Sequence, residues 1–167
     1  MLSRRALPLV ALALLLVACG GGQAKVARTA QYKTDANTVF KAVVDATGQK
    51  HKVERADAPS LMLVTVPRWY EADGTYAPMD ASGEGAMLQD KAILLMYEVR
   101  VVQGAADGTF QVNVIPHIRQ KRSGYAALVD LAPDDMAVPG WVHGKTDLLY
   151  ETIYASLKTY AVTPPGA

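Results

Sequence analysis

The sequence predicts an α+β protein, a two-layer sandwich in which two amphipathic helices cover one face of an antiparallel sheet of about four strands. Three observations predict this class: an apolar stripe at helical spacing within 36–47, a second stripe near the end of the chain, and two long alternating runs that meet at a glycine-rich turn. The length of 167 residues fits one domain, which we place at 28–162 and follow with a tail at 163–167.

Two helices are predicted from periodicity and capping residues. Thr34 and Asp35 are candidate N-caps of the first helix, and Gly48 stands where a glycine often follows the last turn. The apolar residues between them recur at helical spacing: Val39, Phe40, Val43 and Ala46 or Thr47. The second helix is expected to begin at about Gly140 or Thr146 and to end at Tyr160.

A long hairpin is the clearest strand prediction. Residues 92–102 and 109–119 both alternate between apolar and polar side chains, and the turn 104–108 separates them. The residues on the apolar faces of the strands and helices are expected to form the core: Val39, Phe40, Val43, Leu95, Tyr97, Val99, Val112, Val114, Leu149, Ile153 and Leu157.

Three further segments are strand candidates. The dense apolar run 60–66 suits a buried strand, which Pro67 ends or marks as an edge. Segments 27–33 and 49–55 alternate only weakly. The remaining stretches, 71–90 and 121–139, are predicted to be irregular connections.

Catalytic chemistry finds little support in the sequence. The three histidines, His51, His117 and His143, have no metal-ligand spacing, and no serine lies in a nucleophile elbow. The adjacent carboxylates Asp134 and Asp135 are typical of a solvated loop. We therefore expect no catalytic residues, no metal and no cofactor, and hence no enzyme.

Aromatic and methionine side chains gather around the connection 71–90. Trp69, Tyr70, Tyr76 and Met79 lie at its start or inside it, where no local pattern obliges them to be buried. Such residues favour contact surfaces, so we single them out as a partner-binding hypothesis. The alternative is that the connection folds back on the domain and buries them.

The first eighteen residues have the features of an export signal. Arg4 and Arg5 precede 6–18, a run of 13 residues without a charge. A helix of that length rises about 20 Å, too little for a bilayer core of roughly 30 Å. We therefore expect 1–18 to be a cleaved signal peptide.

The end of this run resembles the lipobox of bacterial lipoproteins. It reads Leu16-Val17-Ala18-Cys19, and Cys19 is the only cysteine of the chain. The resemblance implies cleavage before Cys19 and lipidation of Cys19, with 19–27 as the lipidated cysteine and a flexible tether. Several acyl chains give stable membrane anchoring, which one chain does not. By the sorting rule of the family, Gly20 in the next position favours the outer membrane over the inner membrane.

The mature region has a weaker resemblance. Three segments carry it: TDANTVFKAVVDAT at 34–47, KHKVERAD at 50–57 and SLMLVTVPRW at 60–69. Together they resemble small outer-membrane assembly lipoproteins such as the C subunit of the beta-barrel assembly machinery, over about 32–70. The resemblance implies helix-on-sheet packing without catalytic residues.

These observations predict a lipid-anchored, periplasm-facing accessory or scaffolding lipoprotein of the cell envelope, non-enzymatic, with the membrane and envelope proteins as partners. Removal of the leader takes away Arg4 and Arg5 and changes the net charge from +1 to −1, so nucleic acid is not an expected partner. The alternative is a binding module for a small hydrophobic ligand or lipid. An unfilled apolar tunnel would favour the ligand, and a flat aromatic patch would favour a protein partner.

Replacing Cys19 by serine tests the lipoprotein hypothesis. The variant lacks the sulfur that would accept the diacylglyceryl group, so we expect an uncleaved precursor without lipid. Metabolic labelling with a radioactive fatty acid measures this directly. Equal label on the wild type and on Cys19→Ser would contradict the hypothesis.

Overall fold

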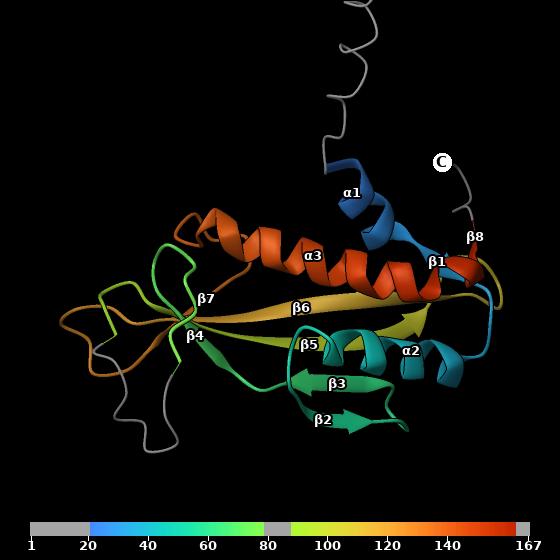
Figure 1. Cartoon of the computed structure of the whole chain (residues 1–167), viewed down its shortest axis with the longest axis horizontal. Helices are drawn as coiled ribbons and strands as arrows, with labels where there is room; N and C mark the ends of the chain where they lie inside the picture. The colour runs from blue at the N-terminus through green and yellow to red at the C-terminus, as the bar shows by residue number, and fades with distance from the viewer. Residues whose placement is uncertain (1–20, 79–87, 163–167) are drawn as a thin grey trace, which may run out of the picture.

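The computed structural model describes residues 21–78 and 88–162, and these ranges form an α+β fold with one open antiparallel sheet (Figure 1). The elements follow in the order α1 (Gly21–Thr29), β1 (Gln31–Tyr32), α2 (Ala36–Gly48), β2 (Val53–Asp57), β3 (Met62–Thr65), β4 (Arg68–Tyr70), β5 (Ile93–Gln103), β6 (Phe110–Gln120), β7 (Val129–Leu131), α3 (Gly140–Leu157), the 3₁₀ helix η1 (Lys158–Tyr160) and β8 (Ala161–Val162).

The predicted class is confirmed, but the predicted number of elements is wrong. The sheet has eight strands instead of about four, and the described ranges hold three α-helices instead of two. Strand β1 lies within the weak candidate 27–33, whereas β4, β7 and β8 were not expected, and all four have only two or three residues each. Strands this short are set by the neighbour they pair with, because they cannot display a period of two in the sequence.

The hairpin β5–β6 forms the centre of the sheet. It pairs continuously from Ile93 opposite Gln120 to Gln103 opposite Phe110. The order of the sheet is β2-β3-β5-β6-β1-β8, while β4 also pairs with β5 and β7 with β6. The hairpin was predicted from its alternating pattern, and the structure confirms it with shifts of one residue at the ends.

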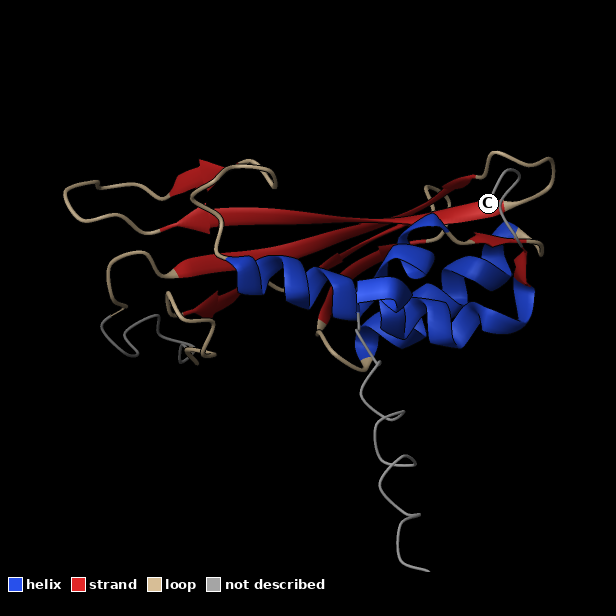
Figure 2. Cartoon of the chain, turned by 90° about the horizontal axis from the view of Figure 1, so that it is seen from above, coloured by secondary structure: helices blue, strands red, loops and turns tan. Residues whose placement is uncertain are grey.

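The helices lie together on one side of the sheet (Figure 2). Helix α3 contacts both α1 and α2, and it packs on β6 while α2 packs on β5. The core lies between the two layers, and all predicted core residues are buried in it: Val39, Phe40, Val43, Leu95, Tyr97, Val99, Val112, Val114, Leu149, Ile153 and Leu157. The face predictions from periodicity are therefore confirmed.

The prediction of a flexible tether at 19–27 is wrong from Gly21 onward, where the chain forms the helix α1. Ala24 and Ala27 are buried on one side of this helix, and Arg28 forms an ion pair with Asp147 of α3 at 2.7 Å. Small side chains at this spacing let α1 approach α3 closely. Tertiary packing thus orders a segment whose glycines suggested flexibility.

Helix α2 begins as predicted and ends differently. The Asp35 carboxylate accepts a hydrogen bond from the backbone N–H of Thr38 at 2.9 Å, which confirms Asp35 as the N-cap. Gly48, expected after the last turn, is instead the last helical residue. The chain leaves the helix through His51, whose N–H donates to Thr47 O at 2.8 Å.

A β-bulge separates β3 from β4. Leu63 pairs with Val99, whereas Tyr70 pairs with Ile93, so the register shifts by one residue around Pro67. The N–H of Tyr97 donates to Thr65 Oγ1 at 2.9 Å where the ladder is interrupted. Because a one-residue shift reverses the faces of a strand, the bulge decides the direction of every side chain of β4.

The β4 residues are placed by this shift. Arg68 lies opposite the buried Leu95 and therefore points toward the helices, as does Tyr70. Trp69 lies opposite Leu94 and points to the other face of the sheet.

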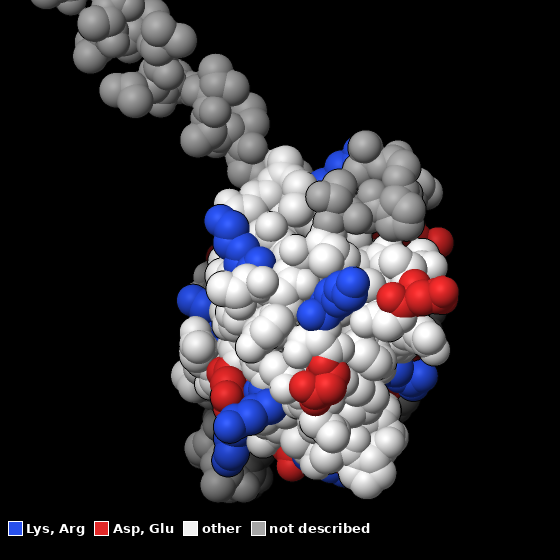
Figure 3. All heavy atoms as spheres, turned by 90° about the vertical axis from the view of Figure 1, so that its right-hand side faces the viewer, with Lys and Arg blue, Asp and Glu red and all other residues white. Residues whose placement is uncertain are grey.

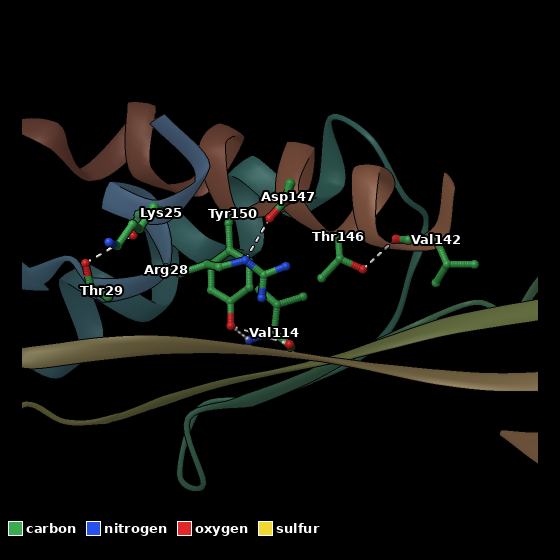
Figure 4. A network of polar contacts seen from close by, with 8 residues as sticks. All are labelled: Lys25, Arg28, Thr29, Val114, Val142, Thr146, Asp147 and Tyr150. Carbon is green, nitrogen blue, oxygen red and sulfur yellow. Dashed lines mark hydrogen bonds and ion pairs between the residues drawn. The ribbon is translucent and has the colours of Figure 1, made fainter. Parts of the chain in front are cut away.

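A tyrosine of α3 completes the hydrogen bonding of β6. On the side away from β5, β6 pairs with β1 at 110–111 and with β7 at 118–120, and no strand of the described ranges borders its middle part. The Val114 N–H on that side donates to Tyr150 Oη at 2.9 Å (Figure 4). Pro116, two residues further on, has no N–H that would need a partner.

Replacing Tyr150 by phenylalanine is expected to destabilise the domain by about 1–3 kcal/mol, because the buried Val114 N–H loses its acceptor. Urea denaturation followed by circular dichroism measures the free energy of unfolding. Tyr125→Phe is the control, since Tyr125 is 66% exposed and should change stability little. Equal stability of Tyr150→Phe and the wild type would show that the bond contributes nothing.

Candidate functional site

A pocket of about 340 Å³ opens on the helix side of the sheet, beyond the C-terminal end of α2. Its lining residues come from the segment after α2, from β4 and the turn that follows it, and from the N-terminal half of α3. Figure 1 shows β4 and the first turns of α3 toward the end of the molecule opposite β1 and β8. Four of its lining residues are basic or histidine and three are aromatic or aliphatic: Lys50, His51, Arg68, Lys145, Tyr70, Tyr76 and Leu148.

A tight turn brings Tyr76 to the pocket. Glu71 N donates to Thr75 O at 2.9 Å, and Tyr76 then forms an isolated antiparallel bridge with Tyr70. The rings of Tyr70 and Tyr76 meet edge to face with centroids 5.9 Å apart. Residues 71–78 of the expected irregular connection 71–90 are therefore hydrogen-bonded and packed, while 79–87 lie outside the described residues.

The turn is fixed from behind by Trp141 of α3. Gly74 has a φ of +90°, and a Cβ at this position would lie 2.8 Å from Trp141 Cγ. The Trp141 indole N–H donates to Ala72 O at 3.0 Å, and its ring lies 5.3 Å from that of Tyr70. The close approach and the positive φ both require glycine at position 74.

Three cations reach the pocket from three different parts of the chain. Lys50 follows α2, Arg68 belongs to β4 and Lys145 belongs to α3. Arg68 Nη1 donates to Lys50 O at 3.0 Å, and the Lys145 ammonium lies 4.6 Å from the centre of the Tyr70 ring. None of the three forms an ion pair with any carboxylate of 21–78 or 88–162.

His51 lies among these cations. Burial, together with the charges of Arg68 and Lys145, lowers the pKa of His51 from 6.5 to about 4. Its ring packs edge to face on Tyr97 at 5.0 Å. At neutral pH His51 is therefore uncharged and can donate one hydrogen bond and accept another.

The structure divides the residues that were predicted to bind a partner. Tyr70 and Tyr76 meet at the pocket, but Trp69 lies on the opposite face of the sheet because of the bulge at Pro67. Met79 and the lipidation candidate Cys19 lie outside the described residues. Tyr76 is 55% exposed and stays a candidate contact residue, whereas Tyr70 is only 5% exposed, so for Tyr70 the alternative of burial holds.

The basic residues and Trp141 were not singled out from the sequence. One signal was available on α3, where Trp141, Lys145 and Leu148 follow one another at spacings of four and three and so share one side of the helix. Lys50, His51 and Arg68 show no local pattern that indicates a common site. Their convergence depends on the end of α2 and on the register of β4.

Other candidate residues are placed in local structure. His117 Nε2 lies 3.4 Å from a Glu98 oxygen, across the β5–β6 pair. The Asp135 carboxylate accepts from Ala137 N at 2.7 Å in an exposed turn. Within the described ranges no group of three or more potential metal ligands occurs. No helix there is long and apolar enough to span a bilayer.

The end of the molecule that carries β1 and β8 has charged residues of both signs, whereas the charged residues that line the pocket are all basic. Figure 3 shows this end with lysine, arginine, aspartate and glutamate interspersed among uncharged residues. The three cations at the pocket are thus a local feature of a nearly neutral chain.

Comparisons with known proteins add no family to this geometry. No protein-family model matches the chain, and no curated protein matches it. The resemblances to lipoproteins therefore stay predictions from the residue patterns alone.

Replacing Lys145 by glutamine is expected to raise the pKa of His51 from about 4 toward 6.5, because one of the charges that oppose protonation is removed. NMR titration of the imidazole Cε1–H signals measures this pKa. Lys158→Gln is the control, since position 158 lies 13 residues along the chain, about 20 Å at helical rise. An unchanged His51 pKa in Lys145→Gln would show that this charge does not act on the ring.

The same pKa predicts how stability depends on pH. Between about pH 6.5 and 4 the unfolded chain binds a proton at His51 that the folded chain does not. The His51 contribution to stability is therefore complete above pH 6.5 and is lost as the pH falls toward 4. Thermal melts of the wild type and of His51→Gln, recorded above pH 6.5 and near pH 4, measure this contribution. The melting temperature of the wild type should fall more between the two pH values than that of His51→Gln.

Proposed function

We propose that the chain is a lipid-anchored accessory lipoprotein of the cell envelope, facing the periplasm from the outer membrane, and that it acts by binding rather than by catalysis. The pocket carries the binding part of this proposal. It combines an exposed tyrosine, a buried tyrosine and three cations without carboxylate partners among the described residues. Aromatic side chains and arginine are enriched at recognition sites, and lysine adds positive charge that attracts an anionic group.

The anchor part rests on the lipobox resemblance at Cys19 and on the position of α1. This helix begins at Gly21, two residues after Cys19. It lies on the same side of the sheet as the other helices (Figure 2). Because α1 is held to α3 through Ala24, Ala27 and the Arg28–Asp147 ion pair, little flexible chain would separate the lipid from the domain. A lipid on Cys19 would therefore keep the domain close to the membrane.

The shape of the site favours a second candidate, the binding of a small ligand. A concave pocket of about 340 Å³ lies in the size range of small-molecule sites, whereas a protein partner would need a broader contact surface. The sequence led to the expectation of a small hydrophobic ligand or lipid, and the basic and aromatic lining favours a ligand that also carries a negative charge. The two candidates are compatible, since an accessory lipoprotein can hold a ligand.

Photocrosslinking in the living bacterium tests the accessory role. A photoreactive phenylalanine analogue at position 76 should capture an envelope component in the outer-membrane fraction, because Tyr76 lies at the exposed side of the pocket. The same analogue at position 125, which is also exposed, is the matched control. Equal adducts at both positions, or none at 76, would contradict a binding role for this site.

A further inference from the structure

We propose that the pocket beside β4 binds a phosphate group, through Arg68 and Lys145 with Lys50 at the rim, and that an apolar part of the same ligand lies against Tyr76 and Leu148. This inference rests on the second candidate function, ligand binding, and it is independent of the lipid on Cys19. It assigns a ligand chemistry to a site that the sequence indicated only through its tyrosines.

The charge balance points to an anion. Three side chains with a positive charge line one pocket, and the structure gives none of them an ion pair within the described ranges. Glu71, the residue that follows β4, does not line the pocket and forms no ion pair with these cations within the described ranges. An anion that enters the pocket is attracted by all three charges, and therefore gains more than at an isolated lysine.

The number of cations favours phosphate over a carboxylate. A carboxylate carries one negative charge and would leave two of the three cations without compensation, whereas a phosphate monoester carries close to two near neutral pH. Arginine presents several donors in a planar fork that matches phosphate oxygens, and lysine binds phosphate as a point charge. Arg68 and Lys145 together offer this pair from two different elements.

The pocket holds these groups in place before a ligand arrives. Arg68 is fixed by the hydrogen bond from Nη1 to Lys50 O at 3.0 Å, which leaves its other N–H groups available. The Lys145 ammonium lies 4.6 Å from the Tyr70 ring centre and 5.7 Å from that of Trp141. Contacts with aromatic faces orient the ammonium without neutralising it.

The remaining walls suit the carbon skeleton of a phosphorylated molecule. Tyr76 is 55% exposed and Leu148 is 51% exposed, and both line the pocket. His51, which is uncharged at neutral pH, also lines the pocket and has one hydrogen-bond donor and one acceptor. A phosphorylated amphiphile fits this arrangement, and either a lipid headgroup or a free phosphate ester carries that chemistry.

Binding can be measured with the chain that lacks Met1–Gly20. This form keeps every buried residue of the described core, the first of which is Ala24. Inorganic phosphate and glycerol 3-phosphate are titrated by NMR and calorimetry, with acetate as the carboxylate comparison. Flotation with phosphatidylcholine vesicles, with and without phosphatidic acid, tests the lipid source.

We expect phosphate or phosphatidic acid to bind and to raise the pKa of His51, because the anion compensates the charges of Arg68 and Lys145 that lower it. His117 and His143 serve as internal controls in the same spectra. Arg68→Gln and Lys145→Gln should each weaken binding about 10-fold to 100-fold, since each loses a charge-assisted hydrogen bond. Lys158→Gln should bind like the wild type.

The outcomes separate the possible ligands. Binding of the soluble phosphates identifies a free ester as the source, and binding only to vesicles with phosphatidic acid identifies a lipid headgroup. The proposal is overturned if neither probe binds, if acetate binds as well as phosphate, or if both pocket variants bind normally. Circular dichroism of each variant verifies folding, and Arg68→Lys, which keeps the charge, provides a second test if Arg68→Gln does not fold. Failure here would leave the Cys19 labelling result unaffected, so the two proposals can fail separately.

Discussion

The pairing of β5 with β6 is the interaction on which the rest of the structure depends. Eleven residues of each strand pair without interruption, and the other elements attach to this ribbon directly or through one neighbour. Strands β3 and β4 pair with β5, strands β1 and β7 pair with β6, and α2 and α3 pack on its buried face. A ribbon of two strands is marginal on its own, so the helix layer and the short strands in turn stabilise the hairpin.

The site depends on one departure from that regular pairing. If β3 continued through Pro67 in the same register, Trp69 would face the helices, and Arg68 and Tyr70 would face the other side of the sheet. The bulge reverses this arrangement and brings Arg68 toward Lys50, while Tyr70 meets Trp141. Proline is tolerated at this point because a bulge leaves one residue out of the ladder.

At the C-terminal end of α2, the apolar core borders a pocket lined by positively charged side chains. The core between α2, α3 and the sheet is apolar and well covered, yet three cations and a neutral histidine converge just beyond it. Cation–aromatic contacts and the hydrogen bond from Arg68 to a backbone carbonyl hold these side chains, but they leave the positive charge uncompensated by described carboxylates. Several positive charges around one pocket attract an anion, and this attraction is the physical basis of the proposed recognition site.

The sequence by itself determined the fold class, the hairpin, the two longer helices and the identity of the core, because periods of two and 3.6 record which side of an element is buried. It also located the N-cap of α2 at Thr34 or Asp35, since a cap is a local interaction between a side chain and nearby N–H groups, and the structure selects Asp35. Only tertiary structure decided where the short strands form and that 21–29 folds into the helix α1, whose alanines are buried because α3 packs against them. It also decided which predicted aromatic residues share a site: Tyr70 and Tyr76 meet, and Trp69 does not, because the faces of β4 follow from its register against β5. Lys50, His51, Arg68 and Lys145 come from three parts of the chain distant in sequence, so their convergence arises from long-range packing that no local pattern records.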